Sequence, residues 1–190
     1  MNLKGSETEK NLLKAFAGES QARNRYAFFA SQAIKEGYQQ ISALFTETGD
    51  NEKEHAKKFF TFLEGGDTEI LATYPAGRIG TTAENLAAAA AGEKEEWGVI
   101  YPSFAETALK EGFAEVARVF KEIADVEAHH EKRYLKLLKN VQDGKVFVKD
   151  IAVAWKCRNC GYVHEGKEAP MVCPACAHPQ SYYELFVENY

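Results

Sequence analysis

Apolar residues recur at three- and four-residue spacing along most of the first 142 residues of the chain. This spacing is typical of helices that bury one face, and it predicts four long helices. Glycines and an Asp-Gly pair interrupt the pattern and mark the helix ends. The expected helices span about 6–36, 38–64, 83–110 and 112–142.

Two features interrupt this helical pattern. Residues 67–82 contain Pro75, Gly77 and Gly80 and show no clean periodicity, so we expect a long crossover connection that runs along the bundle. Pro102 lies inside the third expected helix and lacks a backbone donor, so we expect a bend near Gly98.

Each expected helix carries a glutamate within its apolar stripe. Glu127 and His130 stand three residues apart on the apolar face of the fourth helix, and Glu52 and His55 repeat this pair in the second. Glu19 lies in the stripe of the first helix. Glu93 occupies the matching place in the third.

The two halves of the helical region are related by an internal duplication. A shift of 75 residues places Glu52 on Glu127 and His55 on His130, and a shift of 74 places Glu19 on Glu93. A solvated helix face would explain any one of these glutamates, but the duplicated register argues against that explanation for all four.

An ionised glutamate inside a helix bundle costs several kcal/mol unless a charge or a metal compensates it. The set of four glutamates and two histidines is the one described for ferritin-like di-iron carboxylate bundles, and its oxygen and nitrogen donors suit iron or manganese. Glu96 adds a fifth carboxylate on the same face as Glu93, where the first half of the chain has Ala22.

Two tyrosines fall where they could reach this site. Tyr26 follows Glu19 by seven residues, and Tyr101 follows Glu96 by five. Their hydroxyls could orient the metal ligands, and a plain core position is an equally good interpretation.

All four cysteines lie between positions 157 and 176, in a region that follows the last expected helix. We therefore expect two domains, a helical bundle over 1–145 and a small domain over 146–190. Cys157, Cys160, Cys173 and Cys176 form two Cys-x-x-Cys pairs with the spacing of a tetrahedral metal site. The spacing fits zinc as well as iron, and a redox site elsewhere in the chain favours iron.

Composition limits the remaining possibilities. The net charge is −5 and there is no basic stripe, so we expect no nucleic-acid surface. The first ten residues lack the apolar core of a signal peptide, and no run of residues approaches a membrane span. We expect a cytoplasmic protein without membrane contact, in which paired cysteines bind metal in preference to forming disulfides.

Taken together, these motifs resemble the rubrerythrin family over nearly the whole chain. The resemblance rests on five segments: Ala17-Gly-Glu-Ser-Gln-Ala-Arg-Asn-Arg-Tyr26, Glu52-Lys-Glu-His55, Ala91-Gly-Glu-Lys-Glu-Glu96, Glu127-Ala-His-His130, and a rubredoxin-like tail with Cys157-Arg-Asn-Cys-Gly-Tyr162 and Cys173-Pro-Ala-Cys176. One departure is Ala177, where rubredoxins usually have glycine.

The resemblance implies a mainly α fold, a ferritin-like four-helix bundle with a long crossover followed by a rubredoxin-like domain. It also implies an oxo- or hydroxo-bridged di-iron site, one iron bound by four cysteines, and reduction of hydrogen peroxide to water in defence against oxidative stress. The four-cysteine iron would relay electrons from a donor protein, such as rubredoxin or an NADH-dependent reductase. Family members are typically homodimers.

The same resemblance assigns roles to individual residues. Glu96 and His55 are associated with a redox-linked ligand exchange at one iron, and Tyr26 and Tyr101 are candidates for proton delivery. Two alternatives stay open: a ferroxidase or oxygen-reducing protein that handles iron, and a scaffold whose tail is a zinc ribbon that docks a partner.

Overall fold

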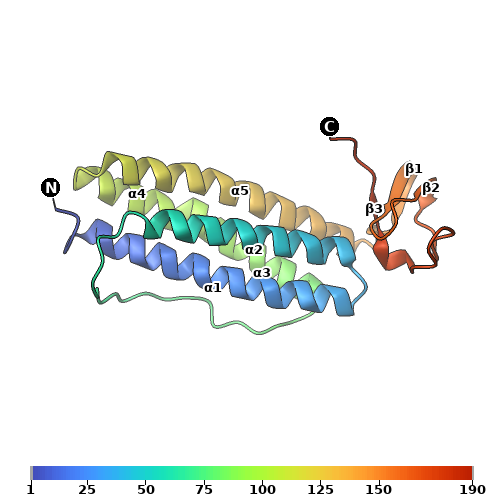
Figure 1. The fold of residues 1–190 in the computed structure, drawn as a ribbon, viewed down its shortest axis with the longest axis horizontal. Helices are drawn as coiled ribbons and strands as arrows, with labels where there is room; N and C mark the ends of the chain where they lie inside the picture. The colour runs from blue at the N-terminus through green and yellow to red at the C-terminus, as the bar shows by residue number, and fades with distance from the viewer. Residues whose placement is uncertain (1, 190) are drawn as a thin grey trace.

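The computed structural model describes residues 2–189 and has two parts, a bundle of long helices and a small sheet at one end of it (Figure 1). The helices are α1 (Glu7–Lys35), α2 (Gln39–Phe60), α3 (Thr82–Glu95), α4 (Tyr101–Lys110) and α5 (Ala114–Gln142). A π-helical turn, η1 (Glu96–Ile100), joins α3 to α4. The sheet contains β1 (Val148–Cys157), β2 (Val163–Glu168) and β3 (Tyr183–Leu185), with a 3-10 turn, η2 (Gln180–Tyr182), before β3.

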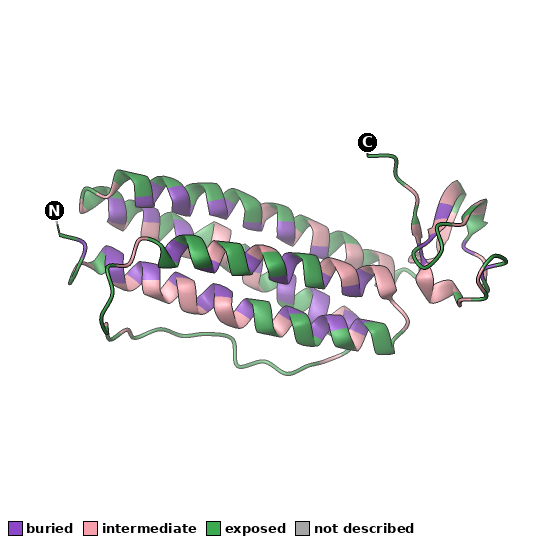
Figure 2. Cartoon of the chain, viewed as in Figure 1, coloured by how far each residue is buried: buried purple, intermediate pink, exposed green. Residues whose placement is uncertain are grey.

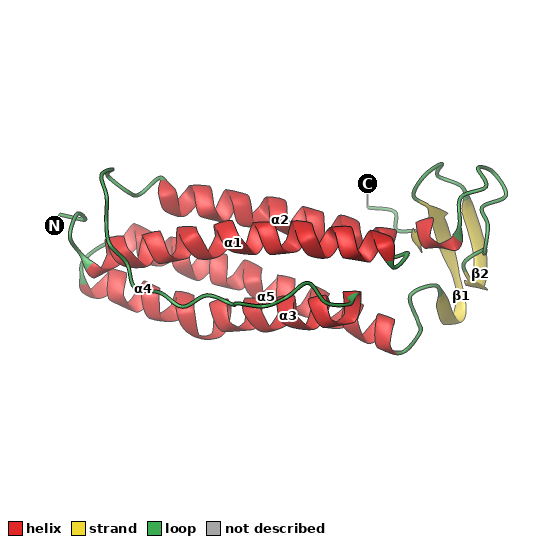
Figure 3. Ribbon diagram, turned by 90° about the horizontal axis from the view of Figure 1, so that it is seen from below, coloured by secondary structure: helices red, strands yellow, loops and turns green. Residues whose placement is uncertain are grey.

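The bundle consists of two helix pairs, α1 with α2 and α3–α4 with α5. Their buried residues face one another across the bundle, and their outer faces are exposed (Figure 2). The segment between α2 and α3 runs along the outside of the bundle (Figure 3). This arrangement confirms the expected mainly α bundle with a long crossover.

Both helix pairs turn through the same glycine-based motif. Gly37 and Gly112 have φ values of 82° and 81°, a backbone region that residues with a Cβ rarely adopt. The residue after each glycine donates its N–H to a carbonyl in the last turn of the helix, at 2.8 Å for both Tyr38 and Phe113. The internal repeat in the sequence therefore corresponds to a repeat of whole helix hairpins.

Each hairpin also caps the first helix of the other hairpin. The Glu36 carboxylate, at the end of α1, accepts the backbone N–H of Thr82 at 3.0 Å. The Glu111 carboxylate, at the end of α4, accepts the backbone N–H of Thr8 at 2.8 Å and its hydroxyl at 2.6 Å. The N–H groups at each helix start, which have no partner within their own helix, thus donate to a carboxylate of the neighbouring pair.

The second helix is shorter than the sequence predicts. We expected it to reach residue 64, but α2 ends at Phe60, and Phe62 and Leu63 continue as tight turns. Both side chains still pack against the apolar core. The apolar spacing therefore continues past the helix, which is why periodicity placed the end too late.

The third expected helix is divided by η1, in place of the simple bend we predicted near Gly98. Glu19 and Tyr26 are seven residues apart in the first half, whereas Glu93 and Tyr101 are eight apart in the second. The second half thus has one additional residue in this interval. A π-turn accommodates one inserted residue within a helix, and η1 is such a turn. The insertion explains why the repeat shift changes from 74 to 75.

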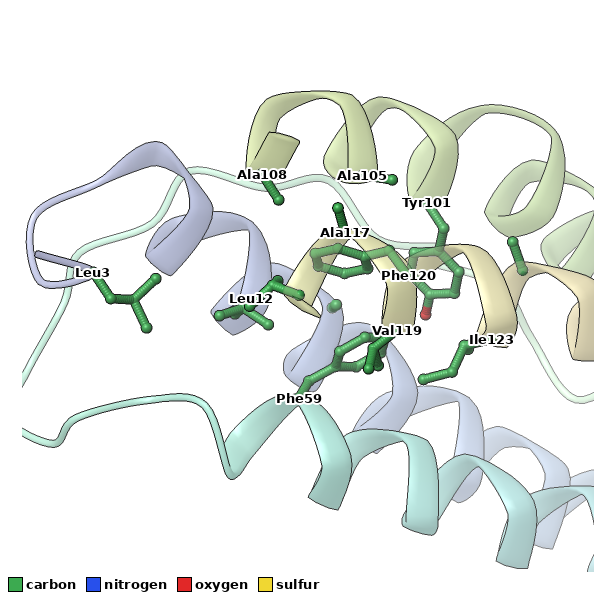
Figure 4. Close-up of a cluster of buried hydrophobic side chains, with 13 residues drawn as sticks. Leu3, Leu12, Phe59, Tyr101, Ala105, Ala108, Ala117, Val119, Phe120 and Ile123 are labelled. Carbon is green, nitrogen blue, oxygen red and sulfur yellow. The ribbon is translucent and has the colours of Figure 1, made fainter. Parts of the chain in front are cut away.

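Aromatic rings from different helices fill the core at the α4 end of the bundle (Figure 4). Phe59 of α2 and Phe120 of α5 stack with ring centroids 4.9 Å apart, and Tyr101 of α4 lies 5.6 Å from Phe59. These side chains are almost fully buried. Their packing holds the helices together on one side of the glutamates described below.

The small sheet has strand order β2-β1-β3, with both pairs antiparallel. Its core contains Trp155 and Tyr183, which are buried beside the cysteines. Phe147, just before β1, stacks on Tyr38 at the start of α2 with centroids 6.2 Å apart. The sheet is therefore joined to the bundle by packing as well as by the chain.

The caps between hairpins lead to a stability prediction. Replacing Glu111 with glutamine should lower the free energy of unfolding at pH 7 by about 1 kcal/mol, since it weakens the capping of α1. Hydrogen bonds from Thr8 lower the pKa of Glu111 in the folded protein, so the carboxylate stabilises the fold at pH values above its unfolded pKa of about 4.3. This stabilisation is lost as the pH falls through the lowered folded pKa.

Chemical denaturation at pH 7 and at pH 3 would measure this effect. Glu122→Gln removes the same charge from an exposed position of α5 and should change stability by less than about 0.5 kcal/mol. Equal losses in the two variants at pH 7 would show that the Glu111 cap does not contribute.

Candidate metal centres

Six side chains from four helices converge in the middle of the bundle. Glu19 comes from α1, Glu52 and His55 from α2, Glu93 from α3, and Glu127 and His130 from α5. All are buried except His55, whose side chain is 13% exposed. The three-residue spacing places each Glu–His pair on the inner face of its helix, as the sequence predicts.

These side chains form two groups that share two members. Glu19, Glu52, His55 and Glu127 make one group, and Glu52, Glu93, Glu127 and His130 make the other. In each group, one possible ligand atom from every residue lies within 4.8 Å of the others. Glu52 and Glu127 belong to both groups and therefore occupy the positions of ligands that bridge two ions.

The histidines and tyrosines repeat this two-fold arrangement. His55 Nδ1 lies 2.9 Å from both Glu52 and Glu127, and His130 Nδ1 lies 2.7 Å from Glu127 and 3.3 Å from Glu52. The Tyr101 hydroxyl donates to Glu19, and the Tyr26 hydroxyl donates to Glu93. Each tyrosine thus contacts the unshared glutamate of the opposite hairpin.

Burial dominates the electrostatics of the unshared glutamates. It raises the pKa of Glu19 well above the ordinary value, and the negative charges of Glu127 and Glu96 add to this effect. Burial likewise raises the pKa of Glu93, to about 8. Without a cation, burial therefore favours the protonated form of both carboxyl groups.

Glu127 and the two histidines shift one another's pKa values. Burial alone would lower the pKa of His55 and His130, but the adjacent Glu127 and Glu52 carboxylates raise it overall, for His55 to about 9. Burial alone would raise the pKa of Glu127, but the two imidazoles lower it. Protonated histidines thus supply the positive charge in the metal-free bundle, and metal binding would displace these protons.

The donor atoms have the bonding capacity that a metal requires. Within residues 2–189, both carboxylate oxygens of Glu52 and Glu127, one oxygen each of Glu19 and Glu93, and Nδ1 of both histidines are buried without a hydrogen bond of good geometry. Unpaired buried oxygens are costly unless a cation contacts them. Two cations between the shared glutamates would use all these atoms.

Glu96 lies outside both groups, although the sequence suggests it as a ligand. It begins the π-turn η1, is half-buried, and lines a cavity at the edge of the site. Burial, and then the charge of Glu93, raises its pKa well above the ordinary value. Its role as a ligand stays a prediction.

Two residues that line the same cavity as Glu96 were not expected from the sequence, Arg25 and Tyr74. Tyr74 lies in the crossover, which has no periodic pattern to indicate that its side chain packs on α1. An arginine at helical spacing also gives no specific signal.

The four cysteines converge in the small sheet domain. The Sγ atoms of Cys157 and Cys176 are 3.8 Å apart, and those of Cys160 and Cys173 are 3.6 Å apart. These distances exceed a disulfide bond of about 2.05 Å. They match the edge of a tetrahedron with metal–sulfur bonds of about 2.3 Å, which is roughly 3.8 Å. The cluster therefore has the geometry of a tetrahedral thiolate site.

Ala177 adopts the backbone of the glycine that it replaces. Its φ is 58°, and its N–H donates to the Cys173 carbonyl at 2.9 Å. In the first Cys-x-x-Cys turn, Gly161 has a φ of 80° and donates to the Cys157 carbonyl at 2.8 Å. The two turns thus keep the same shape, and Ala177 carries some backbone strain that glycine would avoid.

The fold and the two centres define a ferritin-like di-iron carboxylate protein with a rubredoxin-like tail. The family model for rubrerythrin matches residues 10–138, and the model for the rubrerythrin rubredoxin-like domain matches residues 155–184. This chain belongs to the rubrerythrin family, whose members are di-iron oxidoreductases. Within residues 2–189, none of the helices has the length and apolarity needed to span a bilayer.

Individual relatives agree with this assignment. The chain is 65% identical to rubrerythrin from Porphyromonas gingivalis, an alignment that covers 100% of this chain and 94% of the relative. It is 58% identical to rubrerythrin from Nitratidesulfovibrio vulgaris, with 100% and 99% covered. The structure of fully reduced, all-ferrous nigerythrin superposes with a TM-score of 0.64 at 31% identity, over 96% of this chain and 87% of that one.

Rubrerythrins carry a di-iron site and a rubredoxin-like iron domain, and the clusters of this chain fit both. The carboxylate and histidine groups fit two iron ions, and the four cysteines fit one.

The shared and unshared ligands should differ in their effect on iron content. Glu52→Ala and Glu127→Ala should each lose both bundle irons, because each glutamate belongs to both groups. Glu19→Ala and Glu93→Ala should each lose about one. Glu96→Ala should lose less iron than Glu127→Ala, because Glu96 lies outside both groups. Iron per chain after anaerobic reconstitution measures the outcome, with the tail iron counted separately by its visible absorbance. A loss in Glu96→Ala as large as in Glu127→Ala would contradict this division of roles.

Proposed function

We propose that this protein reduces hydrogen peroxide to water at the carboxylate site, with electrons delivered through the four-cysteine iron. The observation that carries the proposal is a cavity lined by Glu96 and Tyr101 beside the paired metal groups. The Tyr101 hydroxyl contacts Glu19, a candidate metal ligand. A small substrate in this cavity would therefore contact Tyr101, which links the cavity to the site.

The residues that would hold the two irons divide according to the two groups. Glu19 and His55 would bind one ion, Glu93 and His130 would bind the other, and Glu52 and Glu127 would contact both. When bound, the reduced iron pair supplies the two electrons that peroxide reduction consumes.

The protein's own groups would supply the protons. Burial raises the pKa of Tyr26 and Tyr101 well above the usual value of about 10, so both hydroxyls keep their protons at neutral pH. Each is already hydrogen-bonded to a carboxylate of the site. Glu96, whose pKa is also raised, lies at the cavity and can carry protons between the cavity and the site.

The electron supply is the second part of the proposal. The cysteine domain packs on the end of the bundle where α2 begins. Cys160 is exposed, so a donor protein could approach this edge of the domain. We place the protein in the cytoplasm as a homodimer, with a rubredoxin or an NADH-dependent reductase as the donor. The combination of both metal centres in one chain supports this relay.

A kinetic experiment tests which centre reacts with peroxide. In the wild type, reduced anaerobically and mixed with peroxide, the visible colour of the oxidised tail should return rapidly. In His130→Ala the return should slow by about 100-fold or more, because a site that lacks one ligand loses several kcal/mol of metal-dependent stabilisation. Stopped-flow absorbance measures both rates.

His129→Ala is the matched control, since His129 is the exposed neighbour of His130 and belongs to neither group. It should behave like the wild type. If His130→Ala recovers its colour as fast as the control, peroxide reacts elsewhere and the proposal fails. Faster recovery with dioxygen than with peroxide would favour the oxygen-reducing alternative.

A further inference from the structure

The cavity beside Glu96 is larger than hydrogen peroxide needs. Its volume is about 240 Å³. A water molecule takes up about 30 Å³, so hydrogen peroxide, with two oxygens, needs roughly 60 Å³. About three-quarters of the cavity would remain after the substrate had bound.

The walls of the cavity are mainly apolar. Val99, Phe104 and Tyr74 contribute apolar surface, and Gly18 forms part of the wall on α1. An apolar wall gives no benefit to a small hydrophilic substrate, because it offers no hydrogen bonds. It does favour an alkyl group, because the transfer of an alkyl group from water to an apolar surface lowers the free energy.

Charged residues of both signs lie around the cavity. Lys14 and Arg25 are basic, and Glu95 and Glu96 are acidic. Lys14 also forms an ion pair with Glu7 at 3.2 Å. The cavity therefore has no cluster of one sign that would select a charged ligand. A neutral molecule with one polar end is therefore the best match.

The crossover closes one side of this space. The Tyr74 hydroxyl donates to the backbone carbonyl of Lys14 at 2.8 Å, which fixes the crossover to α1. A Cβ atom added at Gly18 would lie 3.6 Å from the Tyr74 ring, so the glycine keeps this part of the wall free of a side chain. A larger residue at position 18 would project between α1 and the ring.

We propose that the cavity admits small alkyl hydroperoxides, and that the protein reduces them to the corresponding alcohol and water. The inference rests on the proposed peroxide reduction at the same site. The peroxy end would lie at Glu96 and Tyr101, and the alkyl group would pack against Val99, Phe104 and Tyr74. The O–O bond breaks, two electrons come from the reduced centre as they do for hydrogen peroxide, and two protons complete one alcohol and one water.

The test compares two substrates in the full-length, iron-loaded protein. Steady-state rates with tert-butyl hydroperoxide and with hydrogen peroxide give kcat and KM for each. In the wild type both should turn over. Gly18→Leu should lower the ratio of kcat/KM for the alkyl substrate to that for hydrogen peroxide by at least about tenfold, through a raised KM, because its side chain occupies the alkyl space.

Gly77→Leu is the matched control. It makes the same substitution in the crossover at a position with open space around it that does not line this cavity. Its ratio should equal that of the wild type.

A second measurement does not depend on turnover. Wild-type crystals soaked in tert-butanol, the alcohol product, should show the molecule between Tyr74 and Val99. Its absence from the cavity, or turnover of hydrogen peroxide without turnover of the alkyl substrate, would overturn the inference and leave the proposed function standing. Failure of both substrates would overturn the proposed function as well.

Discussion

The central constraint on this structure is the cost of removing four glutamates from water in the middle of a helix bundle. Glu19, Glu52, Glu93 and Glu127 are each no more than 1% exposed. Two histidines and two tyrosines offset part of this cost through ion pairs and hydrogen bonds. Within the described chain, several of these carboxylate oxygens still lack a hydrogen bond of good geometry, which favours the binding of cations. The buried glutamates therefore serve the binding of cations more than they serve the stability of the core.

The two-fold repeat explains how such a site can be built from a short sequence. Each hairpin supplies one unshared glutamate, one shared glutamate, one histidine and one tyrosine, and its tyrosine contacts the other hairpin. The caps from Glu36 and Glu111 hold the hairpins in the same reciprocal manner. The site is thus closed only when both hairpins are in place.

The function proposed for the protein depends on a difference between the two halves within the site. The additional residue between Glu93 and Tyr101 is accommodated as η1, which starts at Glu96. The corresponding residue in the first half is Ala22, a buried core position. Only the second half therefore has a carboxylate at the edge of the site, and the cavity opens there.

The sequence was sufficient to predict the bundle and the convergence of the two Glu–His pairs, because both depend on local spacing. Glu-x-x-His at three-residue separation determines the helix face, and the repeat relates one half to the other. The end of α2 was misplaced because Phe62 and Leu63 continue the apolar pattern beyond the helix. The π-turn was missed because it depends on a difference in length between the two halves. Tyr74 was missed because the crossover has no periodicity.

Anomalous diffraction at the iron edge, from crystals of the iron-loaded full-length protein, tests the central claim most directly. We expect two iron peaks in the bundle, both contacted by Glu52 and Glu127, with His55 beside one and His130 beside the other, and a third peak among the four cysteines. A single bundle peak, or a pair that Glu52 and Glu127 do not both contact, would contradict the paired site.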